Sequence, residues 1–182
     1  MDTDTSRTGK MATIKNFIRG HWIAIRSSLL FVLSLGVWLS WYPMLVNSNA
    51  LGPFLEFTAR FTGWVLRFLG TNVVINGTII SSPDFTMRIG HECTTIVPTV
   101  ILLCAVIAYP SRIRQKLVCM AIGLPALFLL NLVRTVTLYY IGAHIPDFFD
   151  IAHFLVWQSM MILAVVAIWL LWAGRVANAR SA

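Results

Sequence analysis

Long apolar runs separated by short polar segments dominate the hydrophobic pattern of this chain. About 20 apolar residues in a helix cross the ~30 Å hydrocarbon core of a bilayer, where an unpaired backbone is not tolerated. Each run approaches that length, so the pattern predicts transmembrane helices at about residues 27–46, 94–109, 117–141 and 151–172. The expected fold is an all-α membrane protein, a bundle of about four transmembrane helices.

The segment between the first two runs contains an amphipathic stretch at about residues 53–69. It is apolar enough to suggest a fifth span, but Glu56, Arg60 and Arg67 lie inside it. A charge near the centre of a spanning helix costs roughly 2.5–3.5 kcal/mol on insertion scales. We therefore predict an amphipathic helix on the outer membrane surface, with Glu56 and Arg60 paired one turn apart.

Residues 72–89 change to β-branched runs on either side of Asn76-Gly77, a dipeptide typical of tight hairpin turns. This predicts a small extracytoplasmic β-hairpin, to which residues 85–89 could add a strand. Asn76-Gly77-Thr78 also matches the glycosylation sequon, but the tight turn is sufficient to explain it.

Composition supports a membrane protein, because 58% of the 182 residues are apolar, 12% are charged and the mean hydropathy is +0.77. The net charge of +7 does not indicate a nucleic-acid partner, since the basic residues flank the apolar runs and face membrane lipid. Cys93, Cys104 and Cys119 have neither metal-ligand nor disulfide-framework spacing. We expect no metal and no cofactor.

The distribution of charge predicts the orientation. Lysines and arginines gather near the N-terminus, in the loop 111–116 and at the C-terminus, which makes that side cytoplasmic by the positive-inside rule. Most acidic residues lie in the opposite loops. The first run has no cleavage site and should remain as an anchor. The expected organisation is a cytoplasmic basic segment 1–20, one membrane-embedded domain 21–175 and a cytoplasmic tail 176–182.

Cys93 lies at the outer mouth of the second run, directly after His91-Glu92. A thiolate is a nucleophile, and a helix N-terminus or a nearby cation favours its formation. The alternative is a buried structural cysteine, which is our interpretation of Cys104 and Cys119 within the membrane.

Arg134 lies in the outer half of the third run, and an arginine within the membrane indicates a functional site. Snorkelling to the headgroups is the alternative. Asn131, one turn earlier on the same face, could hold the guanidinium.

His153 opens the fourth run at the same level, where its imidazole could take the thiol proton. The alternative is a histidine that lies at the membrane interface without a catalytic role. Together these residues predict a thiol-based active site.

Other histidines compete for the role of base. His91 and His144 also face outward, and Glu92 could orient an imidazole. The pair His91-Glu92 begins like the zinc-protease motif HExxH, but Thr95 occupies the place of the second histidine. Two further alternatives are a haem or metal bound by His91, His144 and His153, and a non-catalytic membrane scaffold that holds another protein's helix.

Three short segments resemble the exosortase/archaeosortase family: His91-Glu92-Cys93-Thr94-Thr95, Asn131-Leu132-Val133-Arg134 and Asp150-Ile151-Ala152-His153. The similarity covers roughly residues 50–175. Many members have a small residue and then glycine after the cysteine, where this chain has two threonines. The short chain is similar to compact types such as exosortase H or an archaeosortase-like relative.

The resemblance implies a membrane transpeptidase in the inner membrane of a prokaryote, with an extracytoplasmic active site. Its substrate would be an exported protein with a C-terminal sorting signal, composed of a recognition motif, a transmembrane helix and a basic tail. Cleavage through a thioester would transfer that protein to an acceptor at the cell surface. Cys93 would be the nucleophile, Arg134 the essential arginine and His153 the catalytic histidine. The supporting residues would be His91, Glu92, Thr94 and Asn131.

Overall fold

The computed structural model describes residues 3–48 and 50–181 of the chain. The first two residues of the predicted N-terminal segment and the last residue of the predicted tail lie outside this range. The helices are α1 (Thr3–Asn47), α2 (Gly52–Phe68), α3 (Ile96–Ala108), α4 (Ile113–His144) and α5 (Gln158–Ser181). The strands are β1 (Val74–Asn76), β2 (Ile79–Ser81) and β3 (Thr86–Arg88). Short turns of helix are η1 (His91–Cys93), η2 (Pro146–Phe148) and the π-helical η3 (Ile151–Trp157).

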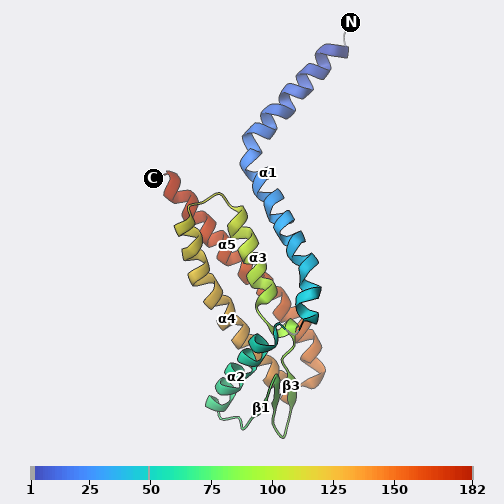
Figure 1. The fold of residues 1–182 in the computed structure, drawn as a ribbon, viewed down its shortest axis with the longest axis vertical. Helices are drawn as coiled ribbons and strands as arrows, with labels where there is room; N and C mark the ends of the chain where they lie inside the picture. Colours follow the sequence, from blue (N-terminus) through green and yellow to red (C-terminus); the bar gives the residue numbers. More distant parts are fainter. Residues whose placement is uncertain (1–2, 49, 182) are drawn as a thin grey trace.

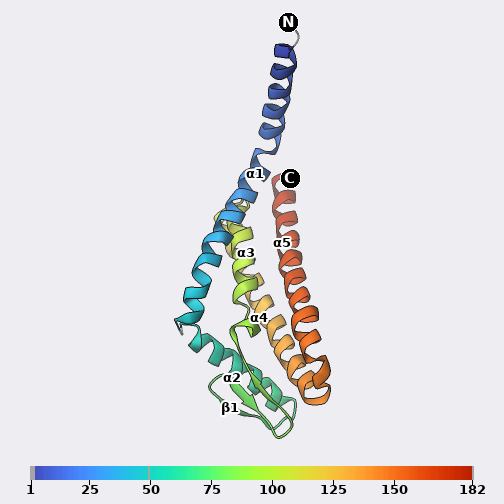
Figure 2. The same ribbon diagram turned by 90° about the vertical axis from the view of Figure 1, so that its right-hand side faces the viewer.

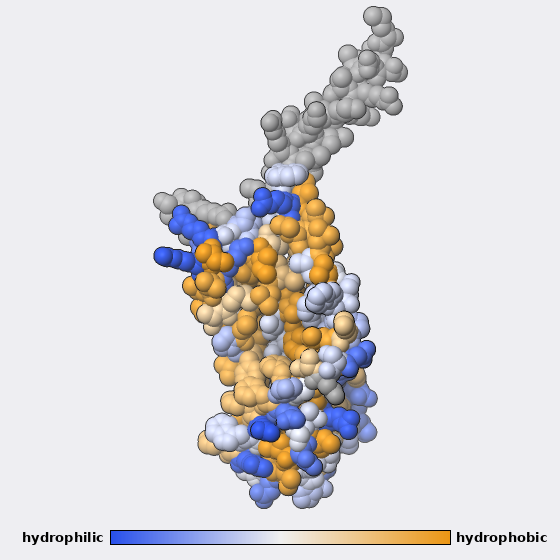
Figure 3. All heavy atoms as spheres, viewed as in Figure 1, coloured by the Kyte–Doolittle hydropathy of each residue, from blue (hydrophilic) through white to orange (hydrophobic). Residues whose placement is uncertain are grey.

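Four helices run alternately toward and away from the end of the molecule that carries the sheet (Figures 1 and 2). α1 packs mainly on α3, while α3, α4 and α5 pack on one another. α2 and the sheet lie together across the end where α1 and α4 finish (Figure 1). Apolar side chains cover the middle of the helices, and polar side chains gather at both ends (Figure 3).

Within the described residues, three helical stretches are long and apolar enough to cross a membrane. They are Ala24–Asn47, Ile113–His144 and Pro146–Asn178. The remaining predicted span, 94–109, contains α3, an apolar helix of only 13 residues, about 20 Å long at 1.5 Å per residue. α3 is short because Thr94 has an extended backbone and Tyr109, which precedes Pro110, is extended as well. The length criterion therefore confirms three of the four predicted spans.

The amphipathic helix and the hairpin are both present. α2 pairs Glu56 with Arg60 at 3.3 Å and buries Thr58, Thr62 and Leu66, while its aromatic Phe57 and Trp64 are exposed. The sheet has the order β1-β2-β3, with both pairs of strands antiparallel. The third strand confirms the extension predicted for residues 85–89.

The hairpin turn differs from the prediction by one residue. Asn76 pairs with Ile79, so the two-residue loop is Gly77-Thr78 and not Asn76-Gly77. Gly77 has a φ of +59°, which suits glycine at the first loop position. This register buries Ile80 completely, and a slip by one residue would turn that side chain to the opposite face.

Hydrogen bonds join α2 and the sheet to α4. Thr62 contacts Thr135 at 3.1 Å, and the hydroxyl of Tyr139 donates to Ser82 Oγ at 2.6 Å. A core of buried side chains from α2, the sheet, α4 and η3 fills the space between them, and it includes Cys93. The sheet end of the bundle is therefore a packed platform around the thiol.

Candidate active site

Cys93 and His153 lie side by side although they are 60 residues apart in the chain. The Sγ atom of Cys93 is 3.6 Å from Nε2 of His153, within hydrogen-bonding distance for sulfur. The two side chains are only 8% and 9% exposed. A thiol and an imidazole in contact and shielded from bulk water are an arrangement suited to nucleophilic catalysis.

The turn η1 fixes the position of the thiol. Its main-chain N–H groups donate to residues three positions earlier, Cys93 to Gly90 at 3.1 Å and Thr94 to His91 at 3.3 Å. The Thr94 hydroxyl also donates to the carbonyl of His91 at 2.7 Å. These bonds hold Cys93 in the tight connection between β3 and α3. Thr94 thus stabilises the turn that carries the thiol.

His153 is carried by the π-helical segment η3, which leads directly into α5. π-helical turns are rare and occur frequently at functional sites. The imidazole is stacked on Phe149 with ring centroids 5.9 Å apart, and it meets the edge of Phe154 at 4.5 Å. Two aromatic rings therefore restrict the orientation of the imidazole beside the thiol.

Arg134 is 2% exposed and is the largest fully buried side chain in the described part of the chain. Its Nε atom has no hydrogen-bond partner among the described residues, and no carboxylate there forms a salt bridge with it. An unpaired buried cation is costly. Such a guanidinium is suited to stabilise an anion that forms only during reaction.

Asn131 contacts the nucleophile's backbone and not the arginine. Its Nδ2 donates to the main-chain carbonyl of Cys93 at 2.9 Å, whereas its Oδ1 has no partner among the described residues. The sequence prediction that Asn131 holds the guanidinium therefore differs from the structure. The amide links α4 directly to η1.

His91 and His144 have partners other than the thiol. His91 pairs with Glu92 through Nε2 and Oε1 at 3.0 Å, and Nδ1 of His144 is 3.0 Å from the carbonyl of Tyr140. In the residues that the structure describes, no three histidine, cysteine, aspartate or glutamate side chains are placed to hold a metal ion. The proposed haem or metal site of His91, His144 and His153 thus finds no support in the geometry.

Tyr42 also lies beside the site, a position that the sequence pattern did not predict. Its ring meets that of His91 with centroids 6.4 Å apart. The only signal in the sequence is that Tyr42 lies near the end of the first apolar run, on the same predicted side of the membrane as Cys93. His91, Glu92 and Tyr42 thus lie together beside the turn that carries Cys93.

Burial raises the pKa of the Cys93 thiol, and the nearby charge of Arg134 opposes this rise without cancelling it. The thiol is therefore protonated at neutral pH, although the sequence had led us to expect surroundings that favour the thiolate. The imidazole of His153 is the group in contact that could accept the thiol proton.

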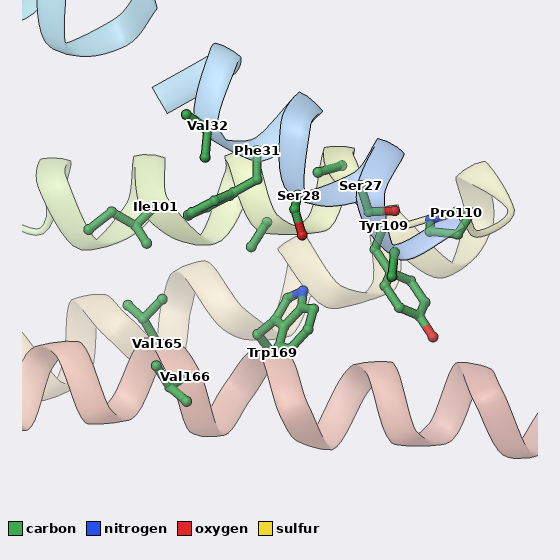
Figure 4. Close-up of a pocket in the computed structure, with 13 residues that line it drawn as sticks. Ser27, Ser28, Phe31, Val32, Ile101, Tyr109, Pro110, Val165, Val166 and Trp169 are labelled. Atoms are coloured by element: carbon green, nitrogen blue, oxygen red, sulfur yellow. The ribbon is translucent and has the colours of Figure 1, made fainter. Parts of the chain in front are cut away.

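A cavity of about 870 Å³ lies between α1, α3 and α5, away from the thiol. Figure 4 shows side chains from all three helices extending into it, among them Ser28, Ile101 and Trp169. It is almost entirely apolar and open at its side. None of the side chains that contact Cys93 or His153 lines this cavity.

Comparison with known proteins defines the family. No curated protein and no solved structure gives a significant match to the chain. The sequence model of the transmembrane exosortase family, of the EpsH type, matches residues 18–173 and so covers η1, α3, α4 and η3. Because this match spans most of the chain, including every residue of the site, the protein belongs to the transmembrane exosortase family.

Proposed function

We propose that this protein is a cysteine transpeptidase in which Cys93 is the nucleophile, His153 the general base and acid, and Arg134 the stabiliser of negative charge. Membership of the exosortase family implies a membrane transpeptidase that acts on sorting signals. The observation that carries the residue assignment is the 3.6 Å contact between Cys93 Sγ and His153 Nε2, together with the buried guanidinium of Arg134, which forms no salt bridge with a described side chain.

In the first half of the reaction, the sulfur of Cys93 attacks the carbonyl carbon of the scissile peptide bond while its proton moves to Nε2 of His153. The carbonyl oxygen becomes an oxyanion, which Arg134 stabilises by charge-assisted hydrogen bonds. When the carbon–nitrogen bond breaks, His153 returns the proton to the leaving amine. A thioester between the substrate and Cys93 remains.

In the second half, an incoming amine attacks the thioester and loses its proton to His153. The carbon–sulfur bond then breaks and the thiolate recovers that proton. Water in place of the amine would give hydrolysis. The charge of Arg134 stays constant throughout, since a guanidinium does not deprotonate in proteins.

The substrate we propose is an exported protein whose C-terminal sorting signal consists of a recognition motif, a transmembrane helix and a basic tail. The enzyme would reside in the inner membrane of a prokaryote with four crossings. The basic loop 111–116 would be cytoplasmic and the sheet end extracytoplasmic. The alternating directions of α1, α3, α4 and α5 support this topology (Figure 1), as does the concentration of described acidic residues at the sheet end.

The cavity beside α3 is our proposed docking surface for the substrate helix. It begins at Ile101, five residues into the helix that follows the active-site loop, or about 8 Å along its axis. Ala105 and Ala108 line it, and small side chains let another helix approach closely. A helix lying there would present the peptide just outside the membrane to Cys93.

A comparison of exported proteins in cells with the wild-type enzyme and with Cys93→Ser tests the proposal and identifies substrates. We expect proteins with C-terminal sorting signals to keep their C-termini in the Cys93→Ser strain, because an alcohol is a much weaker nucleophile than a thiol here. The matched control is Cys104→Ser, in a buried cysteine of α3. Normal processing in the Cys93→Ser strain would instead support the non-catalytic scaffold.

A further inference from the structure

A second cavity, of about 470 Å³, lies at the opposite end of the bundle from the sheet, between the start of α4 and the end of α5. Arg114 and Arg175 line it, one from each helix. The indole of Trp172 donates to the main-chain carbonyl of Gln115 at 2.9 Å and so fixes the two helices against each other. The cavity is therefore a defined space between helices and has no connection with the thiol site.

Among the described side chains, the two arginines have no anionic partner. Both side chains are exposed, and no carboxylate among the described side chains forms a salt bridge with either of them. Glu56, Glu92 and the other acidic residues with described side chains belong to α2, the sheet loops and the η turns at the far end. An arginine pair at this position presents several N–H donors to an external anion.

The rest of the cavity is apolar. Ile122 lies eight residues after Arg114 along α4, and Ile168 lies seven residues before Arg175 along α5. At 1.5 Å per residue, the apolar walls thus extend about 10–12 Å from the arginines toward the centre of the membrane. The cavity thus combines positive charge at the membrane boundary with apolar walls that extend toward the membrane centre. These features are complementary to a molecule with an anionic head and a hydrocarbon tail.

We propose that this cavity binds an anionic phospholipid from the leaflet at the basic end of the bundle. The phosphate would lie between Arg114 and Arg175, and one acyl chain would lie along Ile122 and Ile168. Basic pockets between membrane helices recognise anionic lipid headgroups in this manner. Soluble phosphate would leave the apolar walls unused, and a basic peptide would be repelled by the two guanidinium groups.

Tryptophan fluorescence of the full-length protein in phosphatidylcholine vesicles tests this site. Vesicles contain a minor fraction of brominated phosphatidylglycerol or, separately, the same fraction of brominated phosphatidylcholine. Bromine quenches an indole on contact, and the signal of Trp172 is the part that a Trp172→Phe variant lacks. We expect brominated phosphatidylglycerol to quench Trp172 more strongly than brominated phosphatidylcholine.

The double variant Arg114→Gln/Arg175→Gln should lose this preference, with phosphatidylglycerol binding about 30-fold weaker. The matched control is Arg26→Gln/Arg112→Gln, which removes the same charge at the same end but changes no residue of the cavity. It should keep the preference.

If the two brominated lipids quench Trp172 equally in the protein with both arginines intact, the proposal is wrong, whatever the arginine variants show. An equal loss in both double variants also overturns it, because the attraction would then be a general property of the basic surface. Competition by soluble glycerol phosphate would show a phosphate site in place of a lipid site. None of these results depends on catalysis by Cys93.

Discussion

The side-chain amide of Asn131 donates a hydrogen bond to the main-chain carbonyl of Cys93, with a distance of 2.9 Å between Nδ2 and O. Asn131 is 1% exposed and lies one turn before Arg134 on α4. A single turn of one helix therefore holds the backbone of Cys93 and supplies the positive charge that acts on its thiol. The position of the thiol relative to the guanidinium is set within α4.

Replacement of Asn131 by Ala should reduce processing about 10- to 100-fold, because loss of the bond to a buried carbonyl costs about 1–3 kcal/mol. The pH at which Cys93 becomes reactive should stay unchanged, since the amide bonds the backbone and not the sulfur. Substrate cleavage and maleimide labelling of Cys93 measure the two effects. Thr137→Ala, which removes an exposed bond within α4, is the control. Full activity of Asn131→Ala would exclude a positioning role.

Replacement of Arg134 by Lys should abolish most processing, at least 100-fold, although the charge is conserved. Arginine presents a planar fork of donors to an oxyanion, whereas lysine presents one compact ammonium group. The rate of substrate cleavage measures the effect, with the amount of folded protein in the membrane as the control. Near-normal cleavage by Arg134→Lys would contradict the proposed stabilisation of the oxyanion.

Labelling of Cys93 by a membrane-impermeant maleimide should remain slow at neutral pH and rise only above the ordinary thiol pKa of 9.0, since burial raises the pKa of this group. In an Arg134→Gln variant the rise should shift to still higher pH, because the opposing charge is removed. Both proteins carry Cys104→Ala and Cys119→Ala. A labelling midpoint below 9.0, or one indifferent to Arg134, would contradict this assignment.

The raised pKa of the Cys93 thiol also makes the stability of the folded protein depend on pH. A folded-state pKa above the unfolded value means that the neutral thiol favours the folded protein below about pH 9. That contribution is lost as the pH rises through the folded-state pKa.

The apolar runs predicted most of the helical bundle because a bilayer permits only internally hydrogen-bonded segments. α2 was predictable as well, since Glu56 and Arg60 argue against a further span and pair as expected. The hairpin was predictable in kind but not in register, because its register depends on the burial of Ile80 against other elements. Periodicity carries no information about such contacts.

The sequence was sufficient to predict that Cys93, Arg134 and His153 lie at a similar depth on the same side of the membrane. The sequence could not predict that Asn131 bonds Cys93, because its spacing from Arg134 equally suits a bond within the helix. Burial of Cys93 beneath the sheet was also outside the sequence pattern, and it reverses the expected direction of the thiol pKa. The contact with His153 depends on the π-helical turn η3, for which the sequence gives no signal.

Gly142 allows α4 to approach the sheet end closely, and its replacement by Ala should destabilise the protein by about 1–3 kcal/mol. A Cβ atom at this position would overlap the ring of Phe85, which is packed against Tyr139 and Phe149. Thermal unfolding in detergent measures the loss. Gly36→Ala in α1 is the control, because a Cβ there meets nothing within 4 Å. Equal unfolding temperatures for the two variants would show that the ring moves aside freely.

Filling the cavity beside α3 should separate substrate binding from chemistry. Ala105→Phe places a ring in an apolar space of about 870 Å³, so the fold should accommodate it while the surface for a docked helix is reduced. We expect processing to fall at least 10-fold and the pH profile of Cys93 labelling to stay unchanged, because the thiol lies beyond the other end of α3. Ala121→Phe, at an exposed position of α4 outside this cavity, is the matched control. If Ala105→Phe processes its substrate at the wild-type rate, the substrate helix lies on another face of the bundle.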